Sequence, residues 1–437
     1  MTINKFGVLG KSMAWENLLC QLGIPFKTYD ISENYDFTDI TALVLQTSDC
    51  ISHLAGELFS LETDSILIDT PPFCQREFAE KALANLEVLM IDLEKTFSKI
   101  SKRRQFYYER SELPSERVNI FSHYDVIQYV NNFLVEAFQK RGKTLMGCSG
   151  LPENKPLFIF RIDTDFAEKK EITALSELCR KYEIAATWFV DVYSENILQY
   201  YESFTDQEIG LHCDKHYVYK NKKKNYDNIK SGLDKLLDHN ISPAGFAAPF
   251  GDWNTALEEA LFEHNFSYSS EFAFAWDSLP IVREQNGKKL LQIPIHPISP
   301  GRLRRSHFSQ KEMLDYYIKL IDKNCEMGIP AVIYHHPAHG MLDLIEDIFK
   351  YVKARKINNL SMYSYAAWWL RRYASLSEKE IPEFCKPLIL KEQNSEFTIA
   401  HQRIYRKNWR WYLYEYESYK SRRYFKKHGY PAHIISR

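Results

Sequence analysis

Two aspartates separated by one residue, Asp163 and Asp165, lie at the end of an apolar run that begins at Leu157. Two histidines, His212 and His216, follow a second apolar run. Residues at i and i+2 of a strand share one face, so the two carboxylates can point into the same space. One Asp and two His can hold a metal ion and leave coordination positions open for water and a substrate oxygen. The sequence therefore predicts a catalytic metal centre with Asp165, His212 and His216 as its ligands.

Such a centre suits the hydrolysis of an amide. A zinc ion lowers the pKa of bound water to roughly 7 and polarises a carbonyl, so zinc is the expected cofactor. The departing amine then needs a proton. His336, which precedes Pro337 after a further apolar run, is the candidate general acid, and Asp163 is the candidate general base for the attacking water. His339 is an alternative partner at this end of the site.

These residues must be positioned by strands, with helices between them. Apolar runs predict strands and amphipathic stretches predict helices. The strands are expected at 157–162, 186–190, 208–211, 245–247, 290–295 and 331–334, and the helices at 172–182, 226–237, 255–264, 310–327 and 342–354. This alternation predicts a (β/α) barrel of fewer than eight strands over residues 151–375, with its chemistry at the carboxyl ends of the strands.

Residues 1–150 show a separate alternation. Strands are predicted at 6–9, 25–31, 42–46, 65–69 and 88–91, and helices at 12–22, 52–61, 75–86 and 123–141. This rhythm is typical of a doubly wound sheet, so we expect a Rossmann- or flavodoxin-like α/β domain. The polar, turn-rich segment 150–156 is the expected linker. The domain is expected to be a positioning or assembly module rather than a second enzyme.

The composition is that of an ordinary soluble protein. Of 437 residues, 56 are basic, 57 are acidic and 45% are hydrophobic. The balanced charge indicates no nucleic-acid partner. The eight cysteines lack paired spacing, no signal peptide is evident, and no window reaches about 18 apolar residues. A cytoplasmic location is therefore expected.

The last segment, 376–437, is predicted to be a basic aromatic tail. Residues 401–437 hold ten Lys or Arg, two Glu and ten aromatic residues. Basic and aromatic side chains together favour the headgroup region of a membrane, which predicts peripheral contact with the inner membrane face. The alternative is that the tail packs on its own domains.

Over residues 156–372 the chain resembles the polysaccharide deacetylases, the NodB-homology or carbohydrate esterase family 4 group. Besides the motifs above, it has counterparts of the family's A-T-W/F-F strand, Y-x-S-S segment, I-P-V/I strand and W-W-x-x-R helix, namely Ala185-Ala-Thr-Trp-Phe189, Tyr268-Ser-Ser270, Ile293-Pro-Ile295 and Trp368-Trp-Leu-Arg-Arg372. The resemblance implies a distorted (β/α) barrel of the NodB type and a metal-dependent carbohydrate deacetylase or deformylase.

Two positions depart from the family pattern. The family's first motif has adjacent aspartates, base then ligand, whereas Thr164 separates them here. This form is similar to the branch that deformylates a lipid-linked 4-formamido-arabinose. The third motif usually supplies an arginine that orients the base, and Ala247 stands in its place, which leaves the base without that partner. The deformylase branch also has alanines there, so the departure is compatible with activity.

Substrate contacts are expected around this third motif and the last one. The residues concerned are Pro249, Phe250, Trp253, Trp276 and His335. Trp253 and Trp276 can present apolar faces to a sugar ring, and packing in the core is the alternative for both.

The sequence thus predicts a hydrolase of linear amide C–N bonds that removes an N-acetyl or N-formyl group from an amino sugar in glycan biosynthesis, with lipid- and nucleotide-linked sugars among the candidate substrates. Two alternatives are a same-fold amidase acting on a non-sugar substrate and a catalytically silent glycan-binding module that lost turnover with the arginine at position 247.

Overall fold

The computed structural model describes residues 4–30, 39–45, 66–69, 86–89, 91, 93–97, 101–104, 106–108, 111–193, 195–380 and 385–391. The predicted helix at 52–61, nearly all of that at 75–86, and the tail segment 401–437 lie outside the described residues. Within those ranges no helix has both the length and the apolar character needed to cross a membrane.

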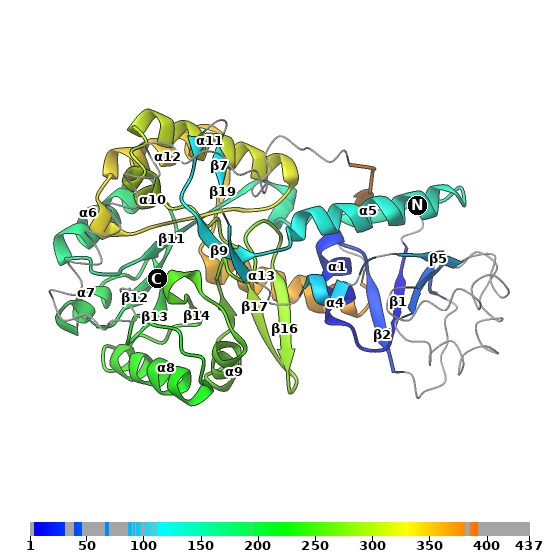
Figure 1. The fold of residues 1–437 in the computed structure, drawn as a ribbon, viewed down its shortest axis with the longest axis horizontal. Coiled ribbons are helices and arrows are strands. Elements are labelled where there is room, and N and C mark those ends of the chain that lie inside the picture. Colours follow the sequence, from blue (N-terminus) through cyan, green and yellow to red (C-terminus); the bar gives the residue numbers. More distant parts are fainter. Residues whose placement is uncertain are drawn as a thin grey trace.

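A nine-stranded sheet forms the centre of the larger part of the molecule, and helices cover it (Figure 1). Its strand order is β16-β17-β15-β14-β13-β12-β11-β18, with β19 also paired to β11. Neighbours run parallel except in the β16–β17 hairpin. The strands are β11 (Leu157–Asp163), β12 (Ala186–Asp191), β13 (Glu208–Cys213), β14 (Gly245–Phe246), β15 (Tyr268–Ser269), β16 (Ile281–Gln285), β17 (Lys288–Gln292), β18 (Ala331–His335) and β19 (Asn358–Asn359).

The helices of this part connect successive strands. They are α6 (Lys169–Lys181), α7 (Leu198–Tyr201), α8 (Lys222–Leu237), α9 (Thr255–Glu263), α10 (Pro300–Arg305), α11 (Gln310–Met327), α12 (Leu342–Ala354) and α13 (Met362–Ser377). All seven residues of β11 are buried, as expected of a strand in a parallel sheet that is covered on both faces. This buried strand carries the aspartates to the edge where the site forms.

The sheet is not closed into a barrel by strand pairing among the described residues, which corrects the barrel expectation. The two edges, β18 and the β16–β17 hairpin, are not paired with each other. One backbone hydrogen bond reaches β18 from the chain that leaves β17, from His296 N to Val332 O at 3.1 Å. Pro294, two residues before His296, has no N–H to donate on that side of the segment, so the ladder does not extend in that direction.

The N-terminal part contains a five-stranded parallel sheet of order β2-β1-β3-β4-β5. Its elements include β1 (Phe6–Leu9), α1 (Met13–Leu22), β2 (Phe26–Tyr29), β3 (Ala42–Leu45), β4 (Ile66–Asp69), β5 (Leu86–Val88), α4 (Leu93–Thr96) and α5 (His123–Gln139). This strand order is one of those that doubly wound sheets use. The helices predicted after β3 and β4 lie outside the described residues, so the Rossmann- or flavodoxin-like assignment stays a prediction.

Several short strand pairs were not predicted. β6 (Ser101–Arg104) pairs with β9 (Glu116–Asn119), β7 (Tyr107–Tyr108) with β8 (Ser111–Glu112), and β10 (Met146–Cys148) with β20 (Cys385–Pro387). Strand β6 reads Ser-Lys-Arg-Arg and has no alternation of apolar and polar residues, so its sequence carries no strand signal.

The two sheets meet around α1, where buried polar side chains form hydrogen bonds between them. The Asn17 side chain donates to the Val282 carbonyl at 2.9 Å and accepts from the Val282 N–H at 2.6 Å. From α13, the buried Arg372 donates to the carbonyls of Cys20 and Cys148. These bonds fix α1 to β16 and α13; the predicted domain boundaries at 150 and 375 remain proposals.

Candidate metal centre

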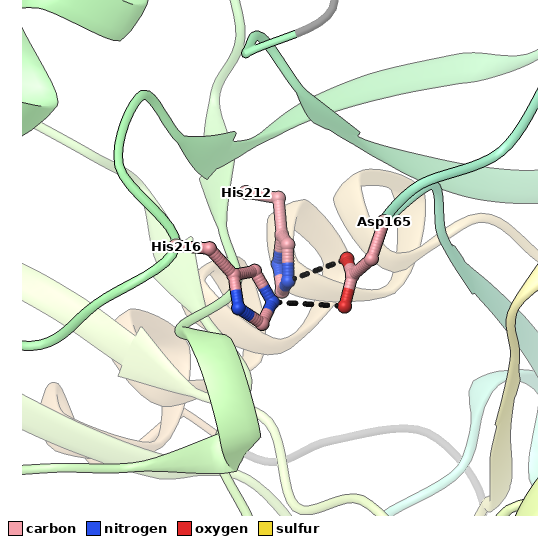
Figure 2. A group of neighbouring side chains, drawn as sticks. All are labelled: Asp165, His212 and His216. Carbon is pink, nitrogen blue, oxygen red and sulfur yellow. Dashed lines mark hydrogen bonds and ion pairs between the residues drawn. The ribbon is translucent and has the colours of Figure 1, made fainter. Parts of the chain in front are cut away.

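Three predicted ligands converge at the carboxyl edge of the large sheet (Figure 2). Asp165 follows β11, His212 lies near the end of β13, and His216 lies in the turn beyond it. Asp165 Oδ1 is 2.8 Å from His212 Nε2, and Asp165 Oδ2 is 2.9 Å from His216 Nε2. All three side chains are buried, and one potential ligand atom from each lies within 4.8 Å of the others.

The donor atoms fit a divalent cation. Asp165 Oδ1, both ring nitrogens of His212 and Nδ1 of His216 are buried and have no hydrogen-bond partner among the described residues. The 2.8 Å contact between His212 and Asp165 is thus an ion-pair approach without hydrogen-bond geometry. Buried polar atoms without partners are costly, and a metal bound by one carboxylate and two imidazoles would satisfy two of them, Asp165 Oδ1 and His212 Nε2. The residues present are therefore able to hold zinc or a similar ion.

The charges of the three groups are strongly linked. Burial raises the pKa of Asp165, but the facing His212 and His216 outweigh burial and bring the pKa well below its usual value. Burial lowers the pKa of His212, but Asp165 outweighs it and raises this pKa to about 9. A cation entering the site must displace the His212 proton, so metal affinity should fall as the pH falls.

The candidate base, Asp163, is paired with an arginine of its own strand. Arg161 Nε donates to Asp163 Oδ1 at 2.6 Å, and Arg161 Nη2 donates to Asp163 Oδ2 at 2.7 Å. The two residues are 2% and 3% exposed. Ala247 leaves the base without the arginine of the third motif, and Arg161 from the base's own strand pairs with it instead. The R-x-D spacing was the available signal, because residues at i and i+2 of a strand share a face.

The candidate acid, His336, also lies near Asp165. Its Nε2 is 3.6 Å from Asp165 Oδ2. Burial lowers the pKa of His336, while Asp165 and Asp163 oppose that effect. The ring of His339, the alternative partner, lies 4.8 Å from that of His336 between centroids, so the two imidazoles are neighbours.

His335 is the last residue of β18, and His336 lies beyond the strand. The register partner of His335 is Ile162, whereas Tyr334 is the partner of Arg161. His335 is fully buried, and its Nε2 lies 2.9 Å from the Gly340 carbonyl oxygen. This placement gives no support to the predicted substrate contact and indicates that His335 holds the loop after β18.

The third motif does bring an aromatic ring to the site. Phe250, in the short 3₁₀ turn Pro249–Gly251, is 39% exposed, and its ring lies edge-on to His216 with centroids 4.9 Å apart. Pro249 is buried and begins the turn. Phe250 therefore presents an apolar surface beside a proposed metal ligand.

The two tryptophans favour the core-packing alternative. Trp253 is buried and packs on Phe274, with ring centroids 5.3 Å apart. Trp276 is buried, and its Nε1–H donates to the Asn119 carbonyl at 3.3 Å. Both rings therefore join elements of the fold, and their proposed sugar contact has no support from this arrangement.

One carboxylate near the site was not predicted. Asp191 ends β12, the strand between β11 and β13, and is 5% exposed. Its N–H donates to Thr164 Oγ1 at 2.9 Å. Burial raises the pKa of Asp191 to about 6, with His216 opposing and Asp165 adding to the rise. Its position directly after a predicted apolar strand was a signal of the same kind as for Asp163 and Asp165.

Comparisons with known proteins give matches to solved structures only. No family model matches the chain, and no curated protein matches its sequence. A putative polysaccharide deacetylase from Mycobacterium smegmatis is 14% identical, with 55% of this chain and 96% of that chain covered and a TM-score of 0.43. A probable polysaccharide deacetylase from Pseudomonas aeruginosa PAO1 is 14% identical, with 51% and 94% covered and a TM-score of 0.44.

A third similar structure is a CE4 family pseudoenzyme from Bacillus anthracis, 13% identical, with 49% of this chain and 66% of that chain covered and a TM-score of 0.37. Identities and TM-scores this low assign neither family membership nor an activity. The chemistry of this chain must be inferred from its own side chains.

Proposed function

We propose that this protein is a metal-dependent hydrolase that removes an N-acetyl or N-formyl group from an amino sugar in glycan biosynthesis. The observation that carries the proposal is the convergence of Asp165, His212 and His216, whose buried donor atoms lie within 4.8 Å of one another. Asp163 and His336 beside this group provide two further groups able to move protons.

The residues of the site have separate roles in metal binding and proton transfer. A bound divalent ion, with zinc favoured by the one-carboxylate, two-imidazole donor set, supplies carbonyl polarisation and a water of lowered pKa. Asp163 accepts a proton from the attacking water. His336 gives a proton to the departing nitrogen as the C–N bond breaks, which leaves acetate or formate and a free amine.

Phe250 supports a sugar as the substrate. Its exposed ring adjoins His216, and aromatic faces pack well against the apolar face of a sugar ring. A lipid- or nucleotide-linked sugar is a proposal that rests on the resemblance of the first motif to that of the deformylase branch. A cytoplasmic location and membrane contact through residues 401–437 are proposals that rest on sequence composition. A positioning role for the N-terminal part, as a Rossmann- or flavodoxin-like domain, is a proposal of the same kind.

Arg161 bears on the alternative of a silent glycan-binding module. That alternative was motivated by Ala247, and the fork from Arg161 to Asp163 supplies an arginine by another route. A same-fold amidase would use the same site and would differ from the proposed enzyme only in acting on a non-sugar substrate.

The test is metal analysis of the purified protein, followed by an acetate- and formate-release assay over a panel of N-acylated amino sugars. The panel should include free, nucleotide-linked and lipid-linked forms, with ureides as the non-sugar arm. Metal-dependent release from a sugar supports the proposal. Release from ureides alone favours the amidase, and binding of sugars without release from any compound favours the silent module.

A further inference from the structure

We propose that Arg161 is a positioning residue that fixes the carboxylate of Asp163 for proton transfer, an inference that rests on the proposed function. Among the described residues, no hydrogen bond or ion pair joins Arg161 to the metal ligands, and its charge is the smallest of the effects on the pKa of His212. Its effect on the reaction would therefore pass through Asp163.

The contact between the two residues determines how the carboxylate is oriented. Nε and Nη2 of Arg161 form two hydrogen bonds, one to each oxygen of Asp163, in a planar fork. Such bidentate pairs add directional constraint to charge attraction, and lysine cannot reproduce it. Nη1 of Arg161 donates to the Ser270 carbonyl, which anchors the far side of the guanidinium.

Aromatic rings restrict the guanidinium further. Its central carbon lies 5.1 Å from the centroid of Phe189 and 5.6 Å from that of Tyr334. Phe189 in turn lies over Gly210, where an added Cβ would be 2.5 Å from the ring. The glycine thus makes room for the ring that packs on Arg161.

This arrangement separates the roles of the two aspartates. Both oxygens of Asp163 are engaged by Arg161, whereas the oxygens of Asp165 face His212 and His216. An aspartate held by a fork cannot turn to join its neighbour as a second metal ligand without breaking two buried, charge-assisted hydrogen bonds. Arg161 therefore keeps Asp163 available as the base.

A purely structural role, neutralising a buried carboxylate, makes a different prediction. Removal of one partner of a buried ion pair destabilises a protein strongly, and removal of both is often tolerated. A double-mutant cycle separates the two roles, because residues that act through one another give non-additive effects on catalysis.

The experiment uses the full chain and an N-acylated amino sugar that the wild-type protein hydrolyses. The variants are Arg161→Lys, Arg161→Met, Asp163→Asn, and Arg161→Met with Asp163→Asn. The readouts are kcat, KM, bound metal and melting temperature. Arg283→Lys is the matched control, because Arg283 also bonds a buried carboxylate, that of Glu258 at 2.7 Å, and lies over an aromatic ring.

Arg161→Lys should lower kcat by about 10- to 100-fold, as expected for misplacement of a catalytic group, with KM and bound metal near wild-type values. Arg161→Met should cause no further loss of kcat in the Asp163→Asn background. If Arg161→Met does not fold alone, Arg161→Lys and the double variant still decide the matter. Arg283→Lys should keep wild-type kcat.

Two results would overturn the inference and leave the proposed function standing. One is wild-type kcat in Arg161→Lys; the other is an Arg161→Met loss that adds in full to that of Asp163→Asn. Absence of amide hydrolysis by the wild-type protein with bound metal would instead overturn the proposed function, and the inference with it.

Discussion

His212 Nε2 lies 2.8 Å from Asp165 Oδ1, although the two residues come from segments separated in the sheet by β12. The contact lacks hydrogen-bond geometry, and the same carboxylate meets His216 through its other oxygen. Two imidazoles and one carboxylate that face a common point are the arrangement expected of a metal site.

Asp165→Asn, His212→Gln and His216→Gln should each reduce bound metal to below about a tenth of the wild-type amount, since each removes one of three ligands. Asp165→Asn keeps the shape of the side chain and removes its charge. Metal per chain is measured by mass spectrometry after dialysis. His239→Gln is the control, because this histidine pairs with Glu202 rather than with the site. Retention of metal in all three variants would rule out the centre.

Asp163→Asn should lower kcat by about 10² to 10⁴, the usual contribution of a general base, while bound metal stays near the wild-type amount. Steady-state kinetics and metal analysis of the same preparation check both parts. Loss of metal in this variant together with retention in Asp165→Asn would show that the two aspartates have the opposite roles.

His336→Gln should affect substrates according to their leaving groups. An amine must be protonated as it departs, so hydrolysis of the amide should fall by about 10² or more. A nitrophenyl ester needs no such proton, and its hydrolysis should fall far less. Parallel assays of the two substrates measure the difference, and equal losses would exclude His336 as the acid.

Strands β11 and β18 could be predicted because each lies in a run rich in apolar residues. The run at 331–334 corresponds to β18, and the run at 157–162 to β11, each with one more residue in the structure. Helix α11 coincides with its prediction, since Ser309 caps its start and Gly328, at φ 73°, ends it.

The features that could not be predicted depend on contacts between segments far apart in the sequence, or on how side chains are oriented and buried in the folded protein. Trp276 could have faced a sugar, and its hydrogen bond to Asn119, 157 positions away, is what keeps it in the core. Pro294 removes one N–H that could face β18, and this effect depends on which strand lies beside it. Arg161 was visible in the sequence, but its fork to Asp163 becomes evident only when both side chains are seen to be buried together.

Glu271 should make the stability of the protein depend on pH. Burial raises its pKa to about 7, with Arg161 opposing, and its oxygens accept hydrogen bonds from Ala248 N and Gln292 Nε2. Between the ordinary carboxyl pKa and about 7 the folded state binds more protons than the unfolded state, so stability falls as the pH rises through that window.

Glu271→Gln removes the ionisable carboxyl group and with it this difference in proton binding between the folded and unfolded states. The free energy of unfolding of the wild-type protein minus that of the variant should therefore decrease from pH 5 to pH 7, by at most about 1.4 kcal/mol per pH unit. Denaturant unfolding at several pH values gives this difference. A difference that is constant or that grows with pH would contradict the assignment.

Residues 401–437 should bind anionic membranes if the tail contacts lipid. Each basic residue near an anionic leaflet contributes about 1 kcal/mol, and exposed charges are screened beyond about 8 Å at physiological ionic strength, so binding should weaken with salt. Co-sedimentation with phosphatidylserine vesicles, at low and high salt, compares the full chain with a chain ending at Gln393. Equal sedimentation of the two would leave the tail without a role in membrane binding.

Amide hydrolysis by metal-depleted and zinc-reconstituted protein tests the central claim most directly. Acetate and formate are quantified after incubation with the panel of N-acylated amino sugars, with the reconstituted His212→Gln variant beside the wild type. We expect release of one of the two acids by the reconstituted wild-type protein, little by the depleted protein, and little by the variant. Release that is the same with and without metal, or no release from any sugar by protein shown to contain metal, would contradict the proposed function.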